Sequence, residues 1–399
     1  MLRMDWVSHL PEEFRCLVEE VEAEFARKGV FFLEEAYLKN VQGKWELFPN
    51  VFPELLEAAK ALREDPENAC WALFVFRCME NREVFCANLS RFDFPEDLHP
   101  YIPLFCLIPT VERSVKVLQE RNLPEAVVRD ILNHYEECVQ LTRERTGKGG
   151  LLKRYFNWLQ AYVDCRILNI DRLRFERITL QAPVWVLEEI ATGEQVLLYG
   201  GGAMRADGLC AQSEPHQDES GFFAQMDENE TAYFGTCVNG EGRCEPDVRV
   251  FSKKEYRRVL APGDNCLSVH IPAKSKGPLT EEACEASYAH ALEIFRKHYP
   301  EFPVKAFFCH SWMLSQEIRP LLPERSNLLA FQQKYRIFPT PSAGKDVFNF
   351  VFRRLNPDEP YETLPEETSL QRKIKQVYCD GGRVYEYGGI RIVSKNDAL

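Results

Sequence analysis

Residues 265–312 read NCLSVHIPAKSKGPLTEEACEASYAHALEIFRKHYPEFPVKAFFCHSW, and they carry the strongest signal for the architecture. Apolar runs at 266–271 and 304–308 predict two strands, and the amphipathic segment 280–299 between them predicts a helix. A strand–helix–strand unit of this length usually pairs its strands in parallel through a right-handed crossover. We therefore expect the carboxyl ends of both strands to lie together at one edge of a sheet.

A histidine marks the carboxyl end of each expected strand, His270 in the first and His310 just after the second. Ligands of parallel-strand units bind beyond these ends. The loop and helix start after the first strand offer candidate phosphate contacts: Lys274, Lys276, Gly277 and Thr280. Basic side chains beside a helix N-terminus suit a phosphate-bearing ligand, and the histidines suit acid–base chemistry next to it.

Neutral imidazole accepts a proton near pH 7, so His270 and His310 are candidates for a general base and a general acid. The alternative for each is a structural histidine that is hydrogen-bonded at a strand end. Cys309 would face the opposite side of an extended strand from its neighbour His310, which disfavours a dyad between the two. Cys309 could pair with His270 in a covalent route, or it could be a buried apolar residue.

Two further polar residues follow these strands. Ser311 and Asn327 could donate hydrogen bonds to a carbonyl group or a cofactor. The alternative is that they cap helices, which is the commoner use of serine and asparagine at such positions.

A different chemistry is suggested by His216 and Asp218, which with His270 mimic the His-x-Asp…His motif of non-haem iron oxygenases. Such a motif needs its first pair at the end of a barrel strand. The segment around His216 reads as a glycine-flanked acidic loop instead, so we expect no metal.

Composition limits the classes of partner. With 61 acidic and 49 basic residues among 399, the chain has a formal net charge of −12, which argues against a nucleic-acid partner or an anionic membrane surface. The 14 cysteines are scattered, as is typical of reduced thiols in a cytosol. No apolar run approaches the roughly 18 residues of a membrane span, and residues 1–13 lack a signal pattern. We expect a cytoplasmic protein that acts on a small molecule, with a homo-oligomer left open.

The chain is long enough for two or three domains. Its pattern is helical up to a glycine break near residue 150, and from about residue 173 the period changes toward two, which predicts an antiparallel meander before the parallel unit. We expect an α+β protein with a helical N-terminal domain (1–150), a mixed sheet with flanking helices (151–355) and a C-terminal extension (356–399).

Three local features are expected near the C-terminus. The apolar run at 348–353 predicts a further strand. A helix should begin at a capping box formed by Thr368 and Gln371. The glycine pair Gly388-Gly389 predicts the turn of a closing β-hairpin.

The segments that carry a family resemblance are 171–176 (DRLRFE), 267–272 (LSVHIP), 277–280 (GPLT), 308–312 (FCHSW), 326–327 (SN) and 368–372 (TSLQR). In these segments the sequence resembles a bacterial family of GNAT-like acyltransferases that carry a helical N-terminal domain. The expected order of meander, strand, helix, strand, helix and closing strands is also similar to that of GNAT enzymes. The resemblance covers most of the chain beyond residue 100.

This resemblance implies a GNAT-like mixed sheet that binds acetyl-CoA or another acyl-CoA between two splayed parallel strands. It implies acyl transfer to an amine by direct attack, with His270 or His310 as the base and Tyr335 as a candidate acid. The phosphate loop departs from the usual Gln/Arg-x-x-Gly-x-Gly/Ala pattern, because Leu279 replaces a small residue and Pro278 removes a backbone donor. The alternative is a binding or structural protein on the same scaffold.

Overall fold

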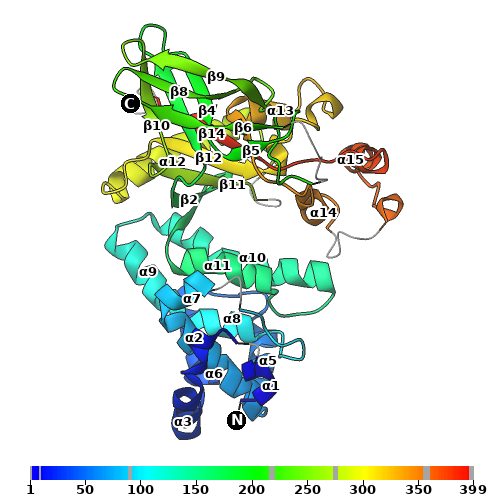
Figure 1. Cartoon of the computed structure of the whole chain (residues 1–399). Coiled ribbons are helices and arrows are strands. Elements are labelled where there is room, and N and C mark those ends of the chain that lie inside the picture. Colours follow the sequence, from blue (N-terminus) through cyan, green and yellow to red (C-terminus); the bar gives the residue numbers. More distant parts are fainter. Residues whose placement is uncertain are drawn as a thin grey trace. The chain divides into compact units, whose positions relative to one another are not determined.

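The computed structural model describes residues 2–8, 10–88, 92–214, 221–272, 277–353 and 360–394. The chain divides into two compact units, Met1–Leu168 and Asn169–Leu399 (Figure 1). The first unit is helical and the second combines mixed sheets with flanking helices, which confirms the expected α+β class. The division falls after the helix that follows the glycine break, whereas the sequence suggested a boundary at the break itself.

The helical unit is built around one helix that is apolar on nearly all sides. Its α-helices are α1 (Met4–Ser8), α2 (Glu12–Arg15), α3 (Val18–Lys28), α4 (Glu35–Trp45), α5 (Phe52–Arg63), α6 (Pro66–Glu80), α7 (Arg82–Asn88), α8 (Ile102–Leu107), α9 (Val111–Glu120), α10 (Glu125–Thr146) and α11 (Lys153–Val163). The side chain of Asp65 caps α6 by accepting from two first-turn amides, and α6 packs against α3, α5 and α8. Helix α11 packs on α8, α9 and α10, so it belongs to this unit.

The second unit contains two larger sheets and a small two-stranded one, and its first strand begins two residues before the boundary between the units. Its strands are β1 (Ile167–Ile170), β2 (Leu173–Thr179), β3 (Val184–Glu189), β4 (Gln195–Tyr199), β5 (Gly202–Met204), β6 (Phe222–Ala224), β7 (Met226–Glu228), β8 (Ala232–Val238), β9 (Cys244–Ser252), β10 (Tyr256–Leu260), β11 (Asn265–His270), β12 (Ala306–Ser311), β13 (Arg336–Pro339) and β14 (Tyr387–Ile392). Sheet A has the order β1-β2-β11-β12-β14-β13, and sheet B has the order β10-β3-β4-β8-β7 with β9 on β8. The expected meander is therefore shared between two sheets, because β2 joins sheet A.

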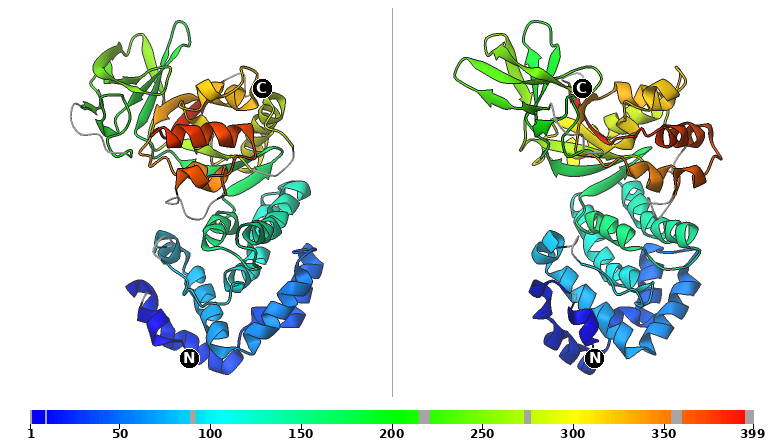
Figure 2. Two further views of the ribbon diagram at one scale, coloured as in Figure 1. Left: turned by 90° about the vertical axis from the view of Figure 1, so that its right-hand side faces the viewer. Right: turned by 45° about the vertical axis from the view of Figure 1, so that its right-hand side comes forward.

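Helices flank sheet A within the second unit. They are α12 (Glu281–His298), α13 (Asn327–Gln333), α14 (Asp346–Phe350) and α15 (Ser369–Cys379). In both views of Figure 2 the green strands of sheet B stand apart from the orange and red helices α14 and α15. The expected capping box is confirmed, since the Thr368 side chain and the Gln371 side chain each bond the other's backbone amide at the start of α15.

The two strands predicted from residues 265–312 pair in parallel as expected, but only over part of their length. Their register runs from Cys266 opposite Ala306 to Ser268 opposite Phe308. Beyond that point β11 continues to pair with β2 as far as His270, and β12 continues to pair with β14 as far as Ser311. The two strands therefore form a fork that opens at their carboxyl ends.

Each face of sheet A packs against a different partner. On one face, Cys266, Ala306 and Phe338 join a buried cluster with side chains of sheet B. On the other face, the ring of Tyr288 in α12 lies 4.7 Å from the ring of Phe307. Since side chains alternate along a strand, these contacts fix the face to which every residue of β11 and β12 belongs.

The expected C-terminal hairpin is wrong, because residues 387–392 form the single strand β14 between β12 and β13. The glycine pair does not turn the chain. It lies within the strand, where an added Cβ on Gly388 would overlap the ring of Phe338 and one on Gly389 would crowd Leu314 and Tyr335. The glycines are therefore explained by close packing rather than by a turn.

The strand expected at 348–353 is also wrong, because the apolar run begins within helix α14 (Asp346–Phe350). Its side chains are buried against α15 in a separate cluster that includes Val347, Phe348 and Tyr378. A short apolar run fits a buried helix turn as well as a strand, and here tertiary packing decided the outcome.

Candidate active site

His270 and His310 lie on the same face of sheet A, at the two open ends of the fork. Cys266 and Ala306 are paired and face sheet B, and each histidine lies an even number of residues further along its strand. Alternation therefore places both imidazoles on the face opposite α12. Both histidines therefore border the open end of the fork on the same face.

His270 is held by a carboxylate from the neighbouring strand. Its Nε2 lies 3.1 Å from Oε2 of Glu176, which is part of β2. Glu176 is opposite Ser268 in the register and thus on the same face as His270. A carboxylate acceptor at this distance orients the imidazole and favours the tautomer that carries its proton on Nε2.

His310 is held by a hydroxyl group. Its Nε2 lies 3.1 Å from Oγ1 of Thr340, and the same hydroxyl donates to the backbone oxygen of Glu386 at 2.9 Å. The His310 ring is open to solvent, yet enough protein surrounds it that desolvation lowers its pKa below the usual 6.5, an effect partly offset by the negative charge of Glu386. Near pH 7 the ring is therefore neutral.

The Glu386 carboxylate is buried, and both of its oxygens accept hydrogen bonds. It accepts hydrogen bonds from the hydroxyl of Ser342 and, at 3.0 Å, from the amide of Asp346. The Ser342 hydroxyl in turn accepts from the Glu386 amide at 2.9 Å. This network fixes the segment that carries Thr340, and through it the ring of His310.

Cys309 and Tyr335 are not brought together with the histidines. Cys309 is an odd number of residues from Ala306 along β12, so its side chain faces α12. It is completely buried, and this burial raises the pKa of its thiol to about 12. The Tyr335 hydroxyl lies 2.5 Å from that of Tyr288, also on the α12 side, and burial raises its pKa well above the usual value.

The side chains expected to contact a cofactor are found mostly at helix starts. Thr280 caps α12 by accepting from the amide of Ala283 at 3.2 Å, and Ser311 caps a 3₁₀ turn by accepting from Met313 at 3.1 Å. Asn327 is the first residue of α13, whose cap is the preceding serine. Ser311 therefore has the capping role named above as its alternative, whereas Asn327 does not cap α13.

The phosphate loop is described only from Gly277 onward, so Lys274 and Lys276 lie outside the described residues. Gly277 has a φ of 92°, a left-handed conformation that favours glycine, and a Cβ added there would meet no atom within 4 Å. The backbone at Gly277 is thus open to an approaching ligand.

The metal alternative rested on His216 and Asp218, which also lie outside the described residues. Within the residues that the structure does describe, no three histidine, cysteine or acidic side chains are grouped so as to hold a metal ion.

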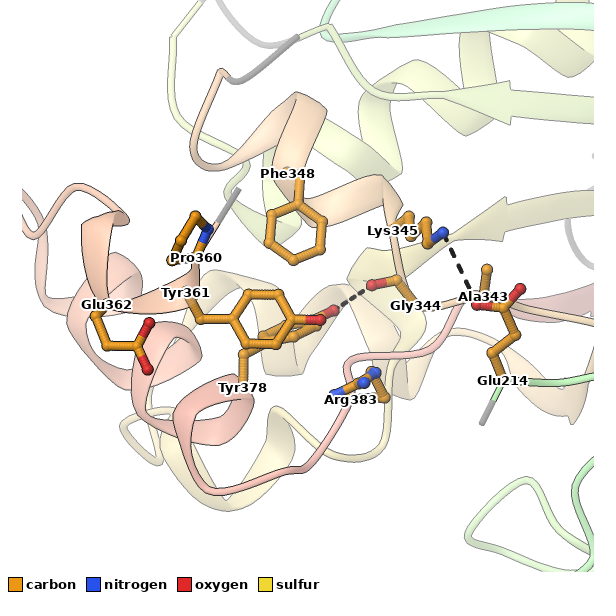
Figure 3. Close-up of a pocket in the computed structure, with 10 residues that line it drawn as sticks. All are labelled: Glu214, Ala343, Gly344, Lys345, Phe348, Pro360, Tyr361, Glu362, Tyr378 and Arg383. Carbon is orange, nitrogen blue, oxygen red and sulfur yellow. Dashed lines mark hydrogen bonds and ion pairs between the residues drawn. The ribbon is translucent and has the colours of Figure 1, made fainter. Parts of the chain in front are cut away.

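A pocket of about 410 Å³ opens near the His310 network (Figure 3). Its lining combines aromatic rings with charges of both signs: Phe348, Tyr361, Tyr378, Arg383, Lys345 and Glu214. The Arg383 guanidinium lies 5.6 Å from the ring centres of both Tyr361 and Tyr378. Two of its lining residues, Ala343 and Arg383, lie three residues from Thr340 and Glu386, respectively, along the chain.

Sequence reasoning missed Glu176, Thr340 and Glu386. The alternation of β2 could have placed Glu176 on a face with His270 if the register of β2 against β11 had been known. Nothing local to residues 340 or 386 indicated their role, because His310 meets them only through the pairing of distant strands.

The fold has counterparts among known proteins. A family model for the GNAT-like C-terminal domain matches residues 167–391, more than half of the chain, and the chain belongs to this family. No curated protein sequence matches it.

Among solved structures, an acyltransferase in complex with decanoyl-CoA and teicoplanin is similar at a TM-score of 0.63 and 17% identity, over 96% of this chain and 97% of that one. A mutant acyltransferase in complex with octanoyl-CoA is similar at 0.63 and 17%, over 98% of this chain and 100% of that one. At such identity the likeness establishes the fold.

Within the described residues, no helix is both long enough and apolar enough to cross a bilayer.

Proposed function

We propose that this protein transfers an acyl group from acyl-CoA to an amine acceptor by direct attack within a ternary complex. The observation that carries the proposal is the fork between β11 and β12, with His270 and His310 on one face at its open ends. Membership of the GNAT-like family supports it, and structures of similar fold hold decanoyl-CoA or octanoyl-CoA.

The environments of the two histidines suggest their roles. His310 is the general base, because its lowered pKa keeps the ring neutral and able to accept a proton near pH 7. His270, oriented by Glu176, is the group that returns a proton to the leaving sulfur. Both lie on the face opposite α12, so one bound thioester can lie between them.

The chemical step balances without further reactants. The neutral acceptor amine attacks the thioester carbonyl, a carbon–nitrogen bond forms and the carbon–sulfur bond breaks. The proton lost from nitrogen passes to His310. The CoA sulfur leaves as a thiolate and takes up the second proton of the His270 imidazolium, which becomes a neutral imidazole with its remaining proton on Nε2 toward Glu176. The products are an amide and CoA.

A covalent route through Cys309 is disfavoured. A thiol is a nucleophile only as its thiolate, and the pKa of about 12 leaves little thiolate near pH 7. Cys309 also faces α12, away from His270, its only proposed partner on the sheet. We therefore assign Cys309 to packing.

The pocket beside the His310 network is the proposed place for the part of the acceptor that does not react. Its volume of about 410 Å³ is in the range of small-molecule sites. Rings such as Tyr361 and Tyr378 suit an apolar or aromatic portion, and Arg383 suits an acidic group on the acceptor.

The direct test is turnover. Purified protein is incubated with acetyl-, octanoyl- or decanoyl-CoA and a panel of amines, and release of the CoA thiol is followed together with the mass of the amide. We expect thiol release that depends on the amine. If no pair of donor and acceptor is turned over, the chain is a binding or structural protein on this scaffold.

A further inference from the structure

Arg172 is a buried cation without a counter-ion in the part of the chain that the structure describes. It lies in the turn between β1 and β2 and is only 7% exposed. Its Nη1 donates to the backbone oxygen of Pro272 at 3.1 Å, whereas Nε has no hydrogen-bond partner. None of the ion pairs among the described residues involves it. Burial lowers the pKa of Arg172, which reflects the same lack of a stabilising anion.

An arrangement of this kind is unfavourable unless an anion neutralises the charge. Arginine is almost never fully buried unless it is paired, because removing a charge from water is costly and only a partner repays that cost. The backbone carbonyl of Pro272 supplies a single acceptor for a group with five donors. The remaining donors have no acceptor among the described residues, and an anionic ligand would supply one.

The position of Arg172 points to where that anion belongs. Its own amide donates to the hydroxyl of Ser287 in α12 at 2.9 Å, and its charge acts on Cys284 one turn closer to the start of the helix. Pro272 begins the loop that leads from β11 into α12. The guanidinium therefore lies beside the N-terminal turns of an 18-residue helix, whose free amides and dipole also favour an anion.

The acidic residues of that helix end form no ion pair with Arg172: Glu281 and Glu285 pair with other cations, and Glu282 is exposed. Glu281 pairs with Lys334. Glu285 is held by both terminal nitrogens of Arg391, at 2.9 and 2.7 Å. Both carboxylates are thereby held by cations other than Arg172.

We infer that Arg172 is a phosphate-binding residue of the donor site, and that together with the first amides of α12 it selects a donor that carries a diphosphate group, as CoA does. The inference rests on the proposed function for the identity of the donor. A planar guanidinium can bind two phosphate oxygens at once, which a diphosphate offers and pantetheine lacks. Arg172 thus compensates for a loop in which Pro278 and Leu279 depart from the usual GNAT pattern.

Calorimetry with CoA, inorganic diphosphate and pantetheine tests the inference without requiring turnover. In Arg172→Gln we expect the Kd for CoA and for diphosphate to rise about 10- to 100-fold, the usual effect of losing a hydrogen bond to a charged group. Binding of pantetheine should not change. Arg296→Gln, which removes an exposed arginine of α12, is the matched control and should bind as the wild type does.

Thermal unfolding separates a binding role from a structural one. Removing an unpaired buried charge should leave the Tm of Arg172→Gln unchanged or higher, whereas loss of a structural contact would lower it and weaken pantetheine binding equally. If Arg172→Gln does not fold, Arg172→Lys takes its place, because lysine keeps the charge but not the planar guanidinium. It should raise the Kd for CoA and for diphosphate by a smaller factor and leave pantetheine binding unchanged.

The outcomes distinguish this inference from the proposed function. CoA binding that depends on Arg172, without turnover of any amine, would overturn the acyl transfer and leave the phosphate role intact. Equal CoA affinity in the wild type and Arg172→Gln would overturn the role of Arg172 even if acyl transfer is observed. Failure of the wild type to bind either CoA or diphosphate would also overturn it.

Discussion

Nε2 of His310 donates its proton to Oγ1 of Thr340, 3.1 Å away. The direction follows from the hydroxyl, which has one proton and donates it to the backbone oxygen of Glu386 at 2.9 Å. Thr340 can therefore only accept from the imidazole. The lone pair of the neutral ring is then on Nδ1, which has no hydrogen-bond partner among the described residues and can accept a proton from an acceptor amine.

Replacing Thr340 tests this relationship. Thr340→Val keeps the shape but removes the acceptor, so we expect kcat to fall about 3- to 10-fold, the worth of one neutral hydrogen bond. The KM for acyl-CoA should change little. Thr340→Ser keeps the hydroxyl and is the matched control. Equal rates for Thr340→Val and the wild type would mean that the ring does not depend on this contact.

The titration of His310 gives a prediction in the free protein. Because desolvation disfavours the charged ring, its pKa should lie below 6.5, and the side chain should gain its proton only as the pH falls through that lower value. Glu386 raises the pKa, so Glu386→Gln should lower it further. Nuclear magnetic resonance of labelled histidine measures both. A His310 pKa at or above 6.5 would contradict the environment described here.

The chemical roles are separated by three alanine variants. His270→Ala and His310→Ala should each lose about 10²–10⁴-fold in activity, the usual contribution of a positioned acid or base. Cys309→Ala should keep most of it. His290→Ala, which changes an exposed histidine of α12, is the control. An acyl adduct on Cys309, visible by intact mass, would instead establish the covalent route.

The glycine pair of β14 can be tested through stability. Gly388→Ala places a methyl group against the ring of Phe338, and such overpacking costs about 1–3 kcal/mol. Urea unfolding should show this loss, while Gly240→Ala, whose added methyl group meets no atom within 4 Å, should be nearly neutral. A neutral Gly388→Ala would mean that the glycine is not required by packing.

The parallel unit could be predicted because its signals are local. Apolar runs predicted β11 and β12, and the amphipathic segment from Thr280 predicted α12. The same local rules predicted a turn at Gly388-Gly389, where the glycines instead make room for Phe338 from a neighbouring strand. That requirement arises from sheet order, which a local pattern does not contain.

The candidate site shows the same limit. The positions of His270 and His310 follow from the crossover, but their partners lie far away in the sequence, 94 residues from His270 to Glu176 and 30 residues from His310 to Thr340. The role proposed for Arg172 likewise follows only from its position beside α12. Strand pairing therefore supplies the information about the site that the sequence alone lacks.

The most direct test of the central claim is a crystal structure of the protein with bound CoA. We predict that the pantetheine arm lies in the fork between β11 and β12, with its sulfur on the face that carries His270 and His310. CoA bound outside the fork, or with its sulfur on the α12 face beside Cys309 and Tyr335, would contradict the account.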